Sequence, residues 1–230
     1  MMMTTEWNNI GVKEGGNNNN KEVKYLKFEE GTTIIRLLDE APVSYYSHWI
    51  TTANKGKGVG IACTGKGCPV CKVIAEERKL KVPYNKMTYS KPIKHMINVL
   101  VKKINGKDIN EVMLLEAGNG IFGSIKDQMT LLTTMGYEPD LTAIDLIINR
   151  TGKGFGDTKY SVICNPATVK PLTEEEKALE KYDLFKVKPD LDNGQVIDLI
   201  AGKSLDEVCG NAEETEDSQP ELDLSGSLPF

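Results

Sequence analysis

Runs of apolar and polar positions along the chain predict a protein built largely from short strands. Residues 93–117 contain two apolar runs on either side of Asn105 and Gly106. Asn-Gly favours a type I′ turn, so these runs predict a tight β-hairpin. Two further apolar runs, separated by a glycine-rich loop between Ile148 and Tyr160, predict a second hairpin. Upstream of both, the pattern predicts two or three more strands, around residues 25–28, 34–38 and 45–50.

Helical spacing of apolar residues is confined to shorter stretches. Between the hairpins it ends at Gly136, where a left-handed C-cap is expected, and the apolar positions are Ile121, Ile125, Met129, Leu132 and Met135. Pro69 suits the first turn of a helix over PVCKVIAEERKL, residues 69–80. The sequence therefore predicts helices that connect or cover strands.

Two capping boxes predict helices near the end of the chain. Thr173 with Glu176 opens the first, and Ser204 with Glu207 opens a short second helix that ends near Gly210. The first is expected to continue through Ala178, Leu179, Tyr182 and Leu184. Several short strands with a few helices favour a mainly β fold with helices (α+β), a small barrel rather than a doubly wound sheet.

The chain divides into four predicted parts. Residues 1–22 form a flexible arm that contains the low-complexity run GGNNNN, and residues 23–170 form the folded body. Residues 171–209 carry the C-terminal helices, and residues 210–230, without apolar periodicity, are expected to be disordered. No apolar run approaches the roughly 18 residues needed to span a bilayer, and no signal-peptide pattern opens the chain. A reducing compartment is therefore expected.

Three cysteines, Cys63, Cys68 and Cys71, fall within nine positions. A disulfide is disfavoured because the total of five cysteines is odd and the other two, Cys164 and Cys209, are distant. The Cys-x4-Cys-x2-Cys spacing also matches the first three ligands of plant-type 2Fe–2S ferredoxins. An iron–sulfur site would need a fourth cysteine, and Cys164 lies 93 positions beyond Cys71.

A histidine can complete a tetrahedral zinc site instead. His48 lies 15 residues before Cys63, at the end of a predicted strand and across a glycine-rich loop. The turn Cys68-Pro69-Val70-Cys71 is typical of a zinc knuckle, which points both sulfurs inward. The sequence therefore predicts one structural Zn²⁺, because four protein ligands leave no open position for catalysis, and the ligands would be His48, Cys63, Cys68 and Cys71.

Net charge is unevenly distributed along the chain. The whole protein carries −5, yet residues 48–107 carry 13 basic and two acidic side chains, a net charge of +11. Residues 204–230 carry eight acidic side chains and no basic one. A basic segment of this strength, wrapped around a thiol cluster, predicts a polyanionic partner.

Aromatic residues alternate with lysines in the basic segment. Lysines neutralise phosphates while rings stack on unpaired bases, so the combination favours single-stranded nucleic acid over a duplex. The glycine-rich loop of the second hairpin lacks the ending of a phosphate-binding P-loop, and we interpret it as a finger that grips the strand. The predicted contacts to single-stranded nucleic acid are Lys79, Lys81, Tyr84, Lys86, Tyr89, Lys91 and Lys94, with Arg150, Lys153, Phe155, Lys159 and Tyr160 on the second hairpin. No Ser-His-Asp set, paired carboxylates or open metal site indicates an enzyme.

In these features the chain resembles the zinc-containing single-stranded DNA-binding proteins of T-even-type tailed bacteriophages, the helix-destabilising proteins of their replisomes. The likeness covers roughly residues 24–165 and rests on EGTTIIRLL, a strand ending at His48, Cys63 followed by CPVCKVI, the strand KHMINVLVKK and the hairpin GFGDTKYSVI. It implies a five-stranded OB-fold barrel with an inserted zinc subdomain at about 45–90, and single-stranded DNA in the positive cleft between them.

The resemblance also implies a role in phage DNA replication, recombination and repair, in the cytoplasm of the infected bacterium, and we expect a monomer. The family's N-terminal arm has a basic patch, whereas residues 1–20 here contain only Lys13, so the likeness does not extend to that patch. The acidic tail resembles that of bacterial single-stranded DNA-binding proteins, whose tip docks replication and recombination proteins. The corresponding tip here is Leu228, Pro229 and Phe230.

Other functions are left open by the residues alone. A zinc-dependent regulator of duplex DNA predicts a recognition helix rich in Arg, Asn and Gln, whereas the helix after the knuckle contains VIAEERKL and the chain has only three arginines. An iron–sulfur electron carrier predicts absorbance in the visible range. RNA offers the same stacking chemistry as single-stranded DNA and is a further alternative ligand.

Overall fold

The computed structural model describes residues 3–5, 10–11, 23–138, 140–154, 156–164 and 169–210. Its strands are β1 (Met3–Thr5), β2 (Ile10–Gly11), β3 (Gly31–Leu37), β4 (Val43–Ile50), β5 (Val59–Ala62), β6 (Ile93–Ile104), β7 (Lys107–Ala117), β8 (Asp145–Thr151) and β9 (Lys159–Cys164). Its helices are α1 (Pro69–Lys79), α2 (Asn119–Thr134), α3 (Glu174–Lys177), α4 (Asn193–Ile200) and α5 (Leu205–Cys209), with short 3-10 helices η1 (Tyr84–Lys86) and η2 (Leu141–Ala143). The predicted mixed α+β class is confirmed, and no helix in these ranges is long and apolar enough to cross a membrane.

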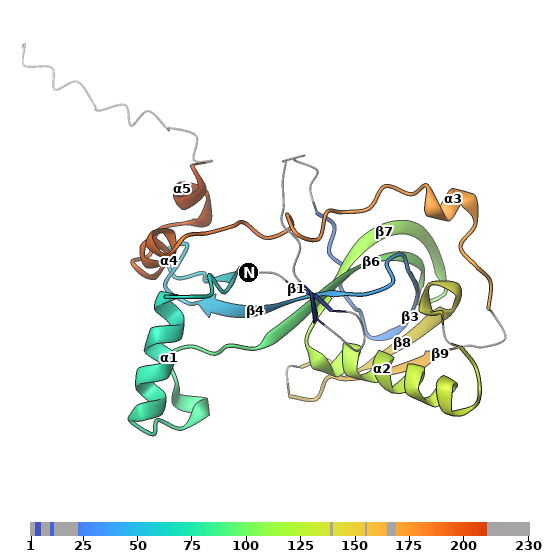
Figure 1. The fold of residues 1–230 in the computed structure, drawn as a ribbon, viewed down its shortest axis with the longest axis horizontal. Helices are drawn as coiled ribbons and strands as arrows, with labels where there is room; N and C mark the ends of the chain where they lie inside the picture. Colours follow the sequence, from blue (N-terminus) through green and yellow to red (C-terminus); the bar gives the residue numbers. More distant parts are fainter. Residues whose placement is uncertain are drawn as a thin grey trace, which may run out of the picture.

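One sheet of nine strands organises the molecule (Figure 1). The strand order is β2-β1-β4-β6-β3-β8-β9, with β5 joined to β4 and β7 joined to β6. The pairings between these strands are antiparallel. Within the described ranges no strand pairing joins β7 to β9, so the sheet is open along that seam. The predicted barrel is thus confirmed only as a mostly antiparallel, open sheet.

The segment before β3 lies along this seam instead of forming the regular strand that the sequence predicts. The Leu26 N–H donates to the Leu114 carbonyl, and the Leu114 N–H donates to the Lys24 carbonyl, both at 2.9 Å. The ring of Phe28 meets the ring of Tyr160 on β9 edge-on, with centroids 5.6 Å apart. Residues 24–28 therefore occupy the free edge of β7 and reach toward β9.

Both turn signals that the sequence offers around β6, β7 and α2 are confirmed. Asn105 and Gly106 have φ angles of 49° and 82°, as a type I′ turn requires at its two central residues. The helix α2 is followed by Gly136 with φ 84°, the left-handed position expected after a helix end. Of the apolar residues predicted for α2, Ile121, Ile125 and Leu132 are buried, whereas Met135 is 61 % exposed.

Of the three buried clusters in the described residues, two form the cores of lobes at opposite ends of the long view (Figure 1), and the third, around Val43, Met96 and Leu184, lies on the sheet beside the C-terminal segment. The sheet lobe, formed by β3, β6–β9 and α2, has a core that includes Ile35, Leu37, Ile97, Val99, Leu115, Ile125, Leu146 and Ile148. The metal lobe, formed by the end of β4, β5, α1, α4 and α5, has a core that includes Ile50, Ile61, Val70, Ile74, Leu191, Val196 and Leu199. Residues 191–209 therefore complete a core that begins more than 100 positions earlier.

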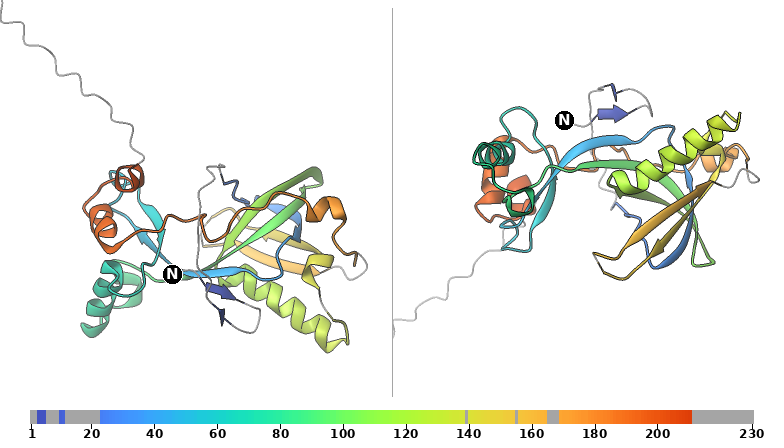
Figure 2. Two further views of the ribbon diagram at one scale, coloured as in Figure 1. Left: turned by 45° about the horizontal axis from the view of Figure 1, so that its top comes forward. Right: turned by 90° about the horizontal axis from the view of Figure 1, so that it is seen from below.

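Residues 178–192, the C-terminal strap, connect α3 on the sheet lobe with α4 on the metal lobe (Figures 1 and 2). The predicted Thr173 capping box is confirmed, but the helix ends at Lys177 instead of continuing to Leu184. Leu184 is buried beside Val43 and Met96, because packing against the sheet outweighs the weak helical spacing of the strap. The helix α4 was not predicted, and its start is capped by Asp192.

Candidate metal centre

A β-hairpin brings the first two predicted ligands together. His48 pairs with Ile61 across β4 and β5, and Cys63 follows directly after β5. The Cys63 N–H donates to the Tyr46 carbonyl at 2.8 Å, which extends the pairing by one step. The strand β5 was not predicted, since its four residues lie within what the sequence presents as a glycine-rich loop.

The other two ligands come from the start of α1. Gly65 and Gly67 both have positive φ, and the Cys68 N–H donates to the Gly65 carbonyl at 3.3 Å, which makes the chain turn sharply. Cys68 is the residue before the helix, with a proline at the first helical positions, so Cys71 lies in the first turn on the same side as Cys68. The predicted knuckle is thus a loop-to-helix turn.

The four ligand atoms form a compact cluster, all within 4.8 Å of one another. Nε2 of His48 lies 3.6 Å from Sγ of Cys68 and 3.5 Å from Sγ of Cys71, and the sulfurs of Cys63 and Cys71 are 3.5 Å apart. Zinc bond lengths in a tetrahedron give about 3.6 Å between a nitrogen and a sulfur ligand and about 3.8 Å between two sulfurs. The cluster can therefore hold one metal ion without a large rearrangement.

The surroundings of the cluster orient its ligands. His48 is fully buried, and Cys63 and Cys68 are nearly so. The Nδ1 atom of His48 lies 2.9 Å from the Ser90 carbonyl, which can only accept, so Nδ1 carries the proton. Nε2 then faces the sulfurs as a ligand atom, the arrangement in which a metal-bound histidine donates its other N–H to the protein.

Electrostatic interactions within the cluster favour the charged forms of two ligands, Cys68 and His48. Burial raises the pKa of Cys68, but hydrogen bonds from His48 and from the Cys71 backbone outweigh burial and hold that pKa well below its usual value. Burial lowers the pKa of His48, yet its bonds to Cys68 and Ser90 raise it overall. A metal ion would replace the proton shared by this pair, so metal binding is coupled to proton release.

The remaining cysteines lie elsewhere. Cys164 belongs to the core of the sheet lobe, where burial raises its pKa to about 11. Cys209 packs at the edge of the metal-lobe core but is not part of the cluster. The four predicted ligands are therefore brought together as the sequence expects, and the set of three sulfurs and one nitrogen is compatible with zinc.

The predicted DNA contacts fall into two groups in the structure. On the metal lobe, the side chains of Lys79, Lys81, Tyr84 and Lys86 are exposed around the end of α1 and η1. Among the predicted aromatic contacts that the structure describes, Tyr84 is the most exposed, at 68 %. This group forms a continuous stretch of surface along the chain.

Three other predicted contacts on this segment are less accessible. Tyr89 is only 8 % exposed and packs in the metal-lobe core, so we assign its ring to the core rather than to a DNA surface. Lys91 is half-buried, with Nζ 4.5 Å from the centre of the Tyr46 ring. Lys94 is half-buried and lies 4.0 Å from Glu116.

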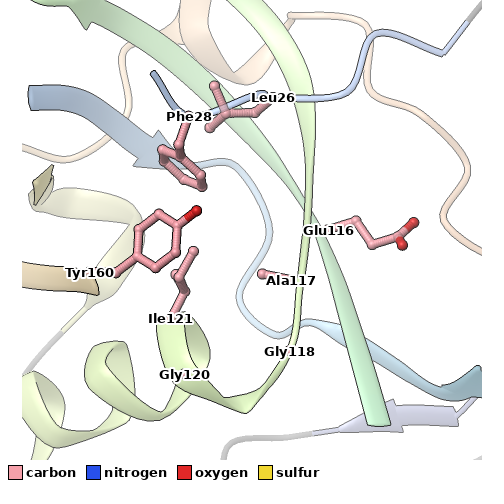
Figure 3. Close-up of a pocket in the computed structure, with 8 residues that line it drawn as sticks. All are labelled: Leu26, Phe28, Glu116, Ala117, Gly118, Gly120, Ile121 and Tyr160. Carbon is pink, nitrogen blue, oxygen red and sulfur yellow. The ribbon is translucent and has the colours of Figure 1, made fainter. Parts of the chain in front are cut away.

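The second hairpin carries the other group. Lys153, Lys159 and Tyr160 are exposed, whereas Arg150 is half-buried and donates to the Phe28 carbonyl at 2.6 Å. Tyr160 also lines a pocket of about 420 Å³ at the seam, together with Leu26, Phe28, Ala117, Gly118, Gly120 and Ile121; the Glu116 side chain points away from it (Figure 3). Phe155 and the tail residues Leu228, Pro229 and Phe230 lie outside the described residues.

Two exposed aromatic residues on β4 were missed as candidate contacts. Tyr46 is 45 % exposed and Trp49 is 55 % exposed, and the sequence analysis places both only within a predicted strand. The signal that could have found them is the neighbouring polar residue Ser47, which breaks the alternation where β4 passes from one lobe to the other. The chain matches no protein-family model, and a search of curated proteins found no match.

Proposed function

We propose that this protein binds single-stranded DNA without sequence preference, as a non-enzymatic protein of phage DNA replication, recombination and repair. One structural zinc would lie in the cluster of His48, Cys63, Cys68 and Cys71. The acidic tail would recruit replication or recombination proteins, and the protein would act in the cytoplasm of the infected bacterium. RNA binding is the alternative, and a comparison of binding to DNA and RNA strands separates it from this proposal.

The observation that carries the proposal is exposed positive charge on the metal lobe; Glu207 of α5 lies near one of these cations, Lys55. Eight lysines and arginines between Lys55 and Lys86 are exposed, and none forms an ion pair with another described residue. By contrast, Lys94, Lys102 and Lys103 on the sheet lobe each pair with an acidic side chain. Phosphates attract such unpaired cations, and the exposed ring of Tyr84 beside them adds a surface on which a base could stack.

The topology of the sheet lobe supports the finer proposal of an OB-type barrel. Five antiparallel strands lie side by side in the order β7-β6-β3-β8-β9, and α2 connects β7 to β8 along the chain. An OB-fold is a partly open, five-stranded barrel whose loops and face bind oligonucleotides. Residues 24–28 along the open seam would then close the barrel in place of direct pairing between β7 and β9.

Zinc is the metal that this ligand set supports best. Soft thiolates with one imidazole in a compact, buried cluster suit tetrahedral Zn²⁺, and four protein ligands make the site structural. The iron–sulfur alternative is disfavoured because Cys164, the candidate fourth thiolate, packs in the core of the other lobe. Metal analysis of the purified protein tests this directly: one zinc per chain is expected, and iron with visible absorbance would overturn it.

A regulator of duplex DNA is the second alternative, and α1 argues against it. A recognition helix presents side chains that read base edges, such as Arg, Asn and Gln. Of these residue types α1 carries only Arg78, and its exposed Glu76, beside Lys72 and Lys79, would repel the backbone of a duplex.

Fluorescence anisotropy of a labelled strand of about 30 nucleotides tests the proposal, with the same strand as a duplex and as RNA, at two salt concentrations. We expect tight, salt-sensitive binding to the single DNA strand and weak binding to the duplex. Equal or tighter binding to the duplex would support the regulator instead. No binding to any of these would mean that the positive charge of the metal lobe serves a protein partner.

A further inference from the structure

The indole of Trp49 lies flat over the backbone of the neighbouring strand. Trp49 on β4 pairs with Gly60 on β5. A Cβ atom added at Gly60 would meet the six-membered part of the indole at 3.4 Å and 3.5 Å, and one added at Gly58 would meet the indole nitrogen at 2.8 Å. Because neither glycine has a side chain, one face of the ring rests directly on the backbone of residues 58–60.

The position of the ring leaves its other side open to solvent. Trp49 is 55 % exposed, although tryptophan is a residue that folded proteins usually cover. A ring held flat by backbone on one face and open on the other has its orientation fixed before any ligand arrives. Such a ring loses little conformational freedom on binding, which makes it a suitable platform for a second flat ring.

Charge around this ring favours an anionic partner. Residues 41–75 contain four lysines and no acidic residue, and Lys55 and Lys57 lie on the exposed loop between β4 and β5. Glu207 of α5 lies near Lys55 and Lys203, whereas Lys57 forms no ion pair with the part of the chain that the structure describes. A nucleotide within a single strand fits both features, because its unpaired base is flat and its phosphate is anionic.

We propose that Trp49 is a stacking site for an unpaired nucleobase, with Lys57 contacting the adjacent phosphate. The inference rests on the proposed binding of single-stranded DNA and adds to it a contact that lies outside the predicted set. It enlarges the nucleic-acid surface from the α1–η1 region onto the β4–β5 hairpin of the same lobe.

Intrinsic fluorescence isolates this contact, because Trp7 and Trp49 are the two tryptophans of the chain. In Trp7→Phe protein, titration with an oligo(dT) strand should quench Trp49 emission strongly. An abasic strand of equal length and charge should quench it much less, since it has phosphates but no rings. Equal quenching by both strands would show that only charge is sensed and would overturn the proposal.

Affinity measurements give an independent test. Trp49→Leu keeps an apolar cover over the glycines but removes the ring, and it should weaken oligo(dT) binding by about 5- to 100-fold. Trp49→Phe should retain most of the affinity. The matched control is Tyr137→Leu, because Tyr137 is 53 % exposed but lies beside Glu138 and Asp140, and it should leave binding unchanged.

The outcomes separate the two proposals. If wild-type protein does not bind single strands, the proposed function fails as a whole. If wild-type protein binds and Trp49→Leu binds equally well, only the stacking site is overturned, and the indole serves merely to cover the glycine backbone. Metal content and thermal unfolding of each variant show whether it is folded, and the Trp7→Phe titration decides the matter if Trp49→Leu does not fold.

Discussion

Replacing Asn98 by alanine tests whether one buried side chain holds the C-terminal strap to the sheet. Asn98 is 2 % exposed, and its amide nitrogen donates to Asp39 at 2.9 Å and to the Tyr182 carbonyl at 3.0 Å. Its amide oxygen accepts from the Tyr182 N–H at 2.9 Å. A neutral hydrogen bond contributes about 1 kcal/mol to stability, and one to a charged group contributes about 1.5–3 kcal/mol. The three bonds together therefore suggest a loss of about 3–5 kcal/mol in the free energy of unfolding.

We expect Asn98→Ala to fall at the lower end, about 3 kcal/mol, because Tyr182 is half-buried and water can replace part of what its backbone loses. Equilibrium unfolding in urea, followed by circular dichroism, measures the change. Asn85→Ala is the matched control, since Asn85 is exposed on η1 and surface substitutions usually change stability by less than about 0.5 kcal/mol. A loss below about 1 kcal/mol for Asn98→Ala would refute the reasoning.

Three further predictions follow from the metal centre, the β4–β5 hairpin and the sheet-lobe core. Replacing Cys68 by serine should abolish the binding of one metal ion per chain, as measured by metal analysis. This substitution, and removal of the metal with a chelator, should each lower the melting temperature, as measured by calorimetry. Gly58→Ala should lower the free energy of unfolding by about 2–3 kcal/mol, because the φ of Gly58 is +76° and an added Cβ would meet Trp49. Gly56 has φ +83° with open space around it, so Gly56→Ala should lower the same free energy by only about 1 kcal/mol, and urea unfolding measures both changes. The pKa of Cys164 is raised to about 11 from its ordinary 9.0, so its contribution to stability is complete below pH 9 and is lost as pH rises to 11. Unfolding measured across that range should show a smaller decline for Cys164→Ala than for wild type.

The parts of the fold that the sequence predicts are those fixed by neighbouring residues. A type I′ turn at Asn105-Gly106, a knuckle at Cys68–Cys71 and the capping boxes at Thr173 and Ser204 all depend on contacts within a few positions. The four residues of the metal cluster could be predicted for a related reason, because the chain offers few other thiols and only two histidines.

The parts that could not be predicted depend on distant contacts. Tyr89 alternates with lysines in the sequence, yet it is buried because Leu191 and Val196, far along the chain, share its core. Leu184 continues a helical spacing, but the sheet surface around Val43 and Met96 binds it in an extended strap. Local pattern carries no information about these partners, and packing against them outweighs propensity.

The late arrival of α4 sets the order in which the metal lobe can be completed during synthesis. All four ligands have been made by residue 71, whereas Leu199, which closes the core beneath them, follows 128 residues later. At about 5–20 residues per second, the ribosome needs roughly 6–26 s for this interval. Throughout it, the nascent thiols and the apolar face of α1 lack their final cover. A truncated product that stops before residue 191 would keep every metal ligand and still expose the surface that degradation and chaperone systems recognise.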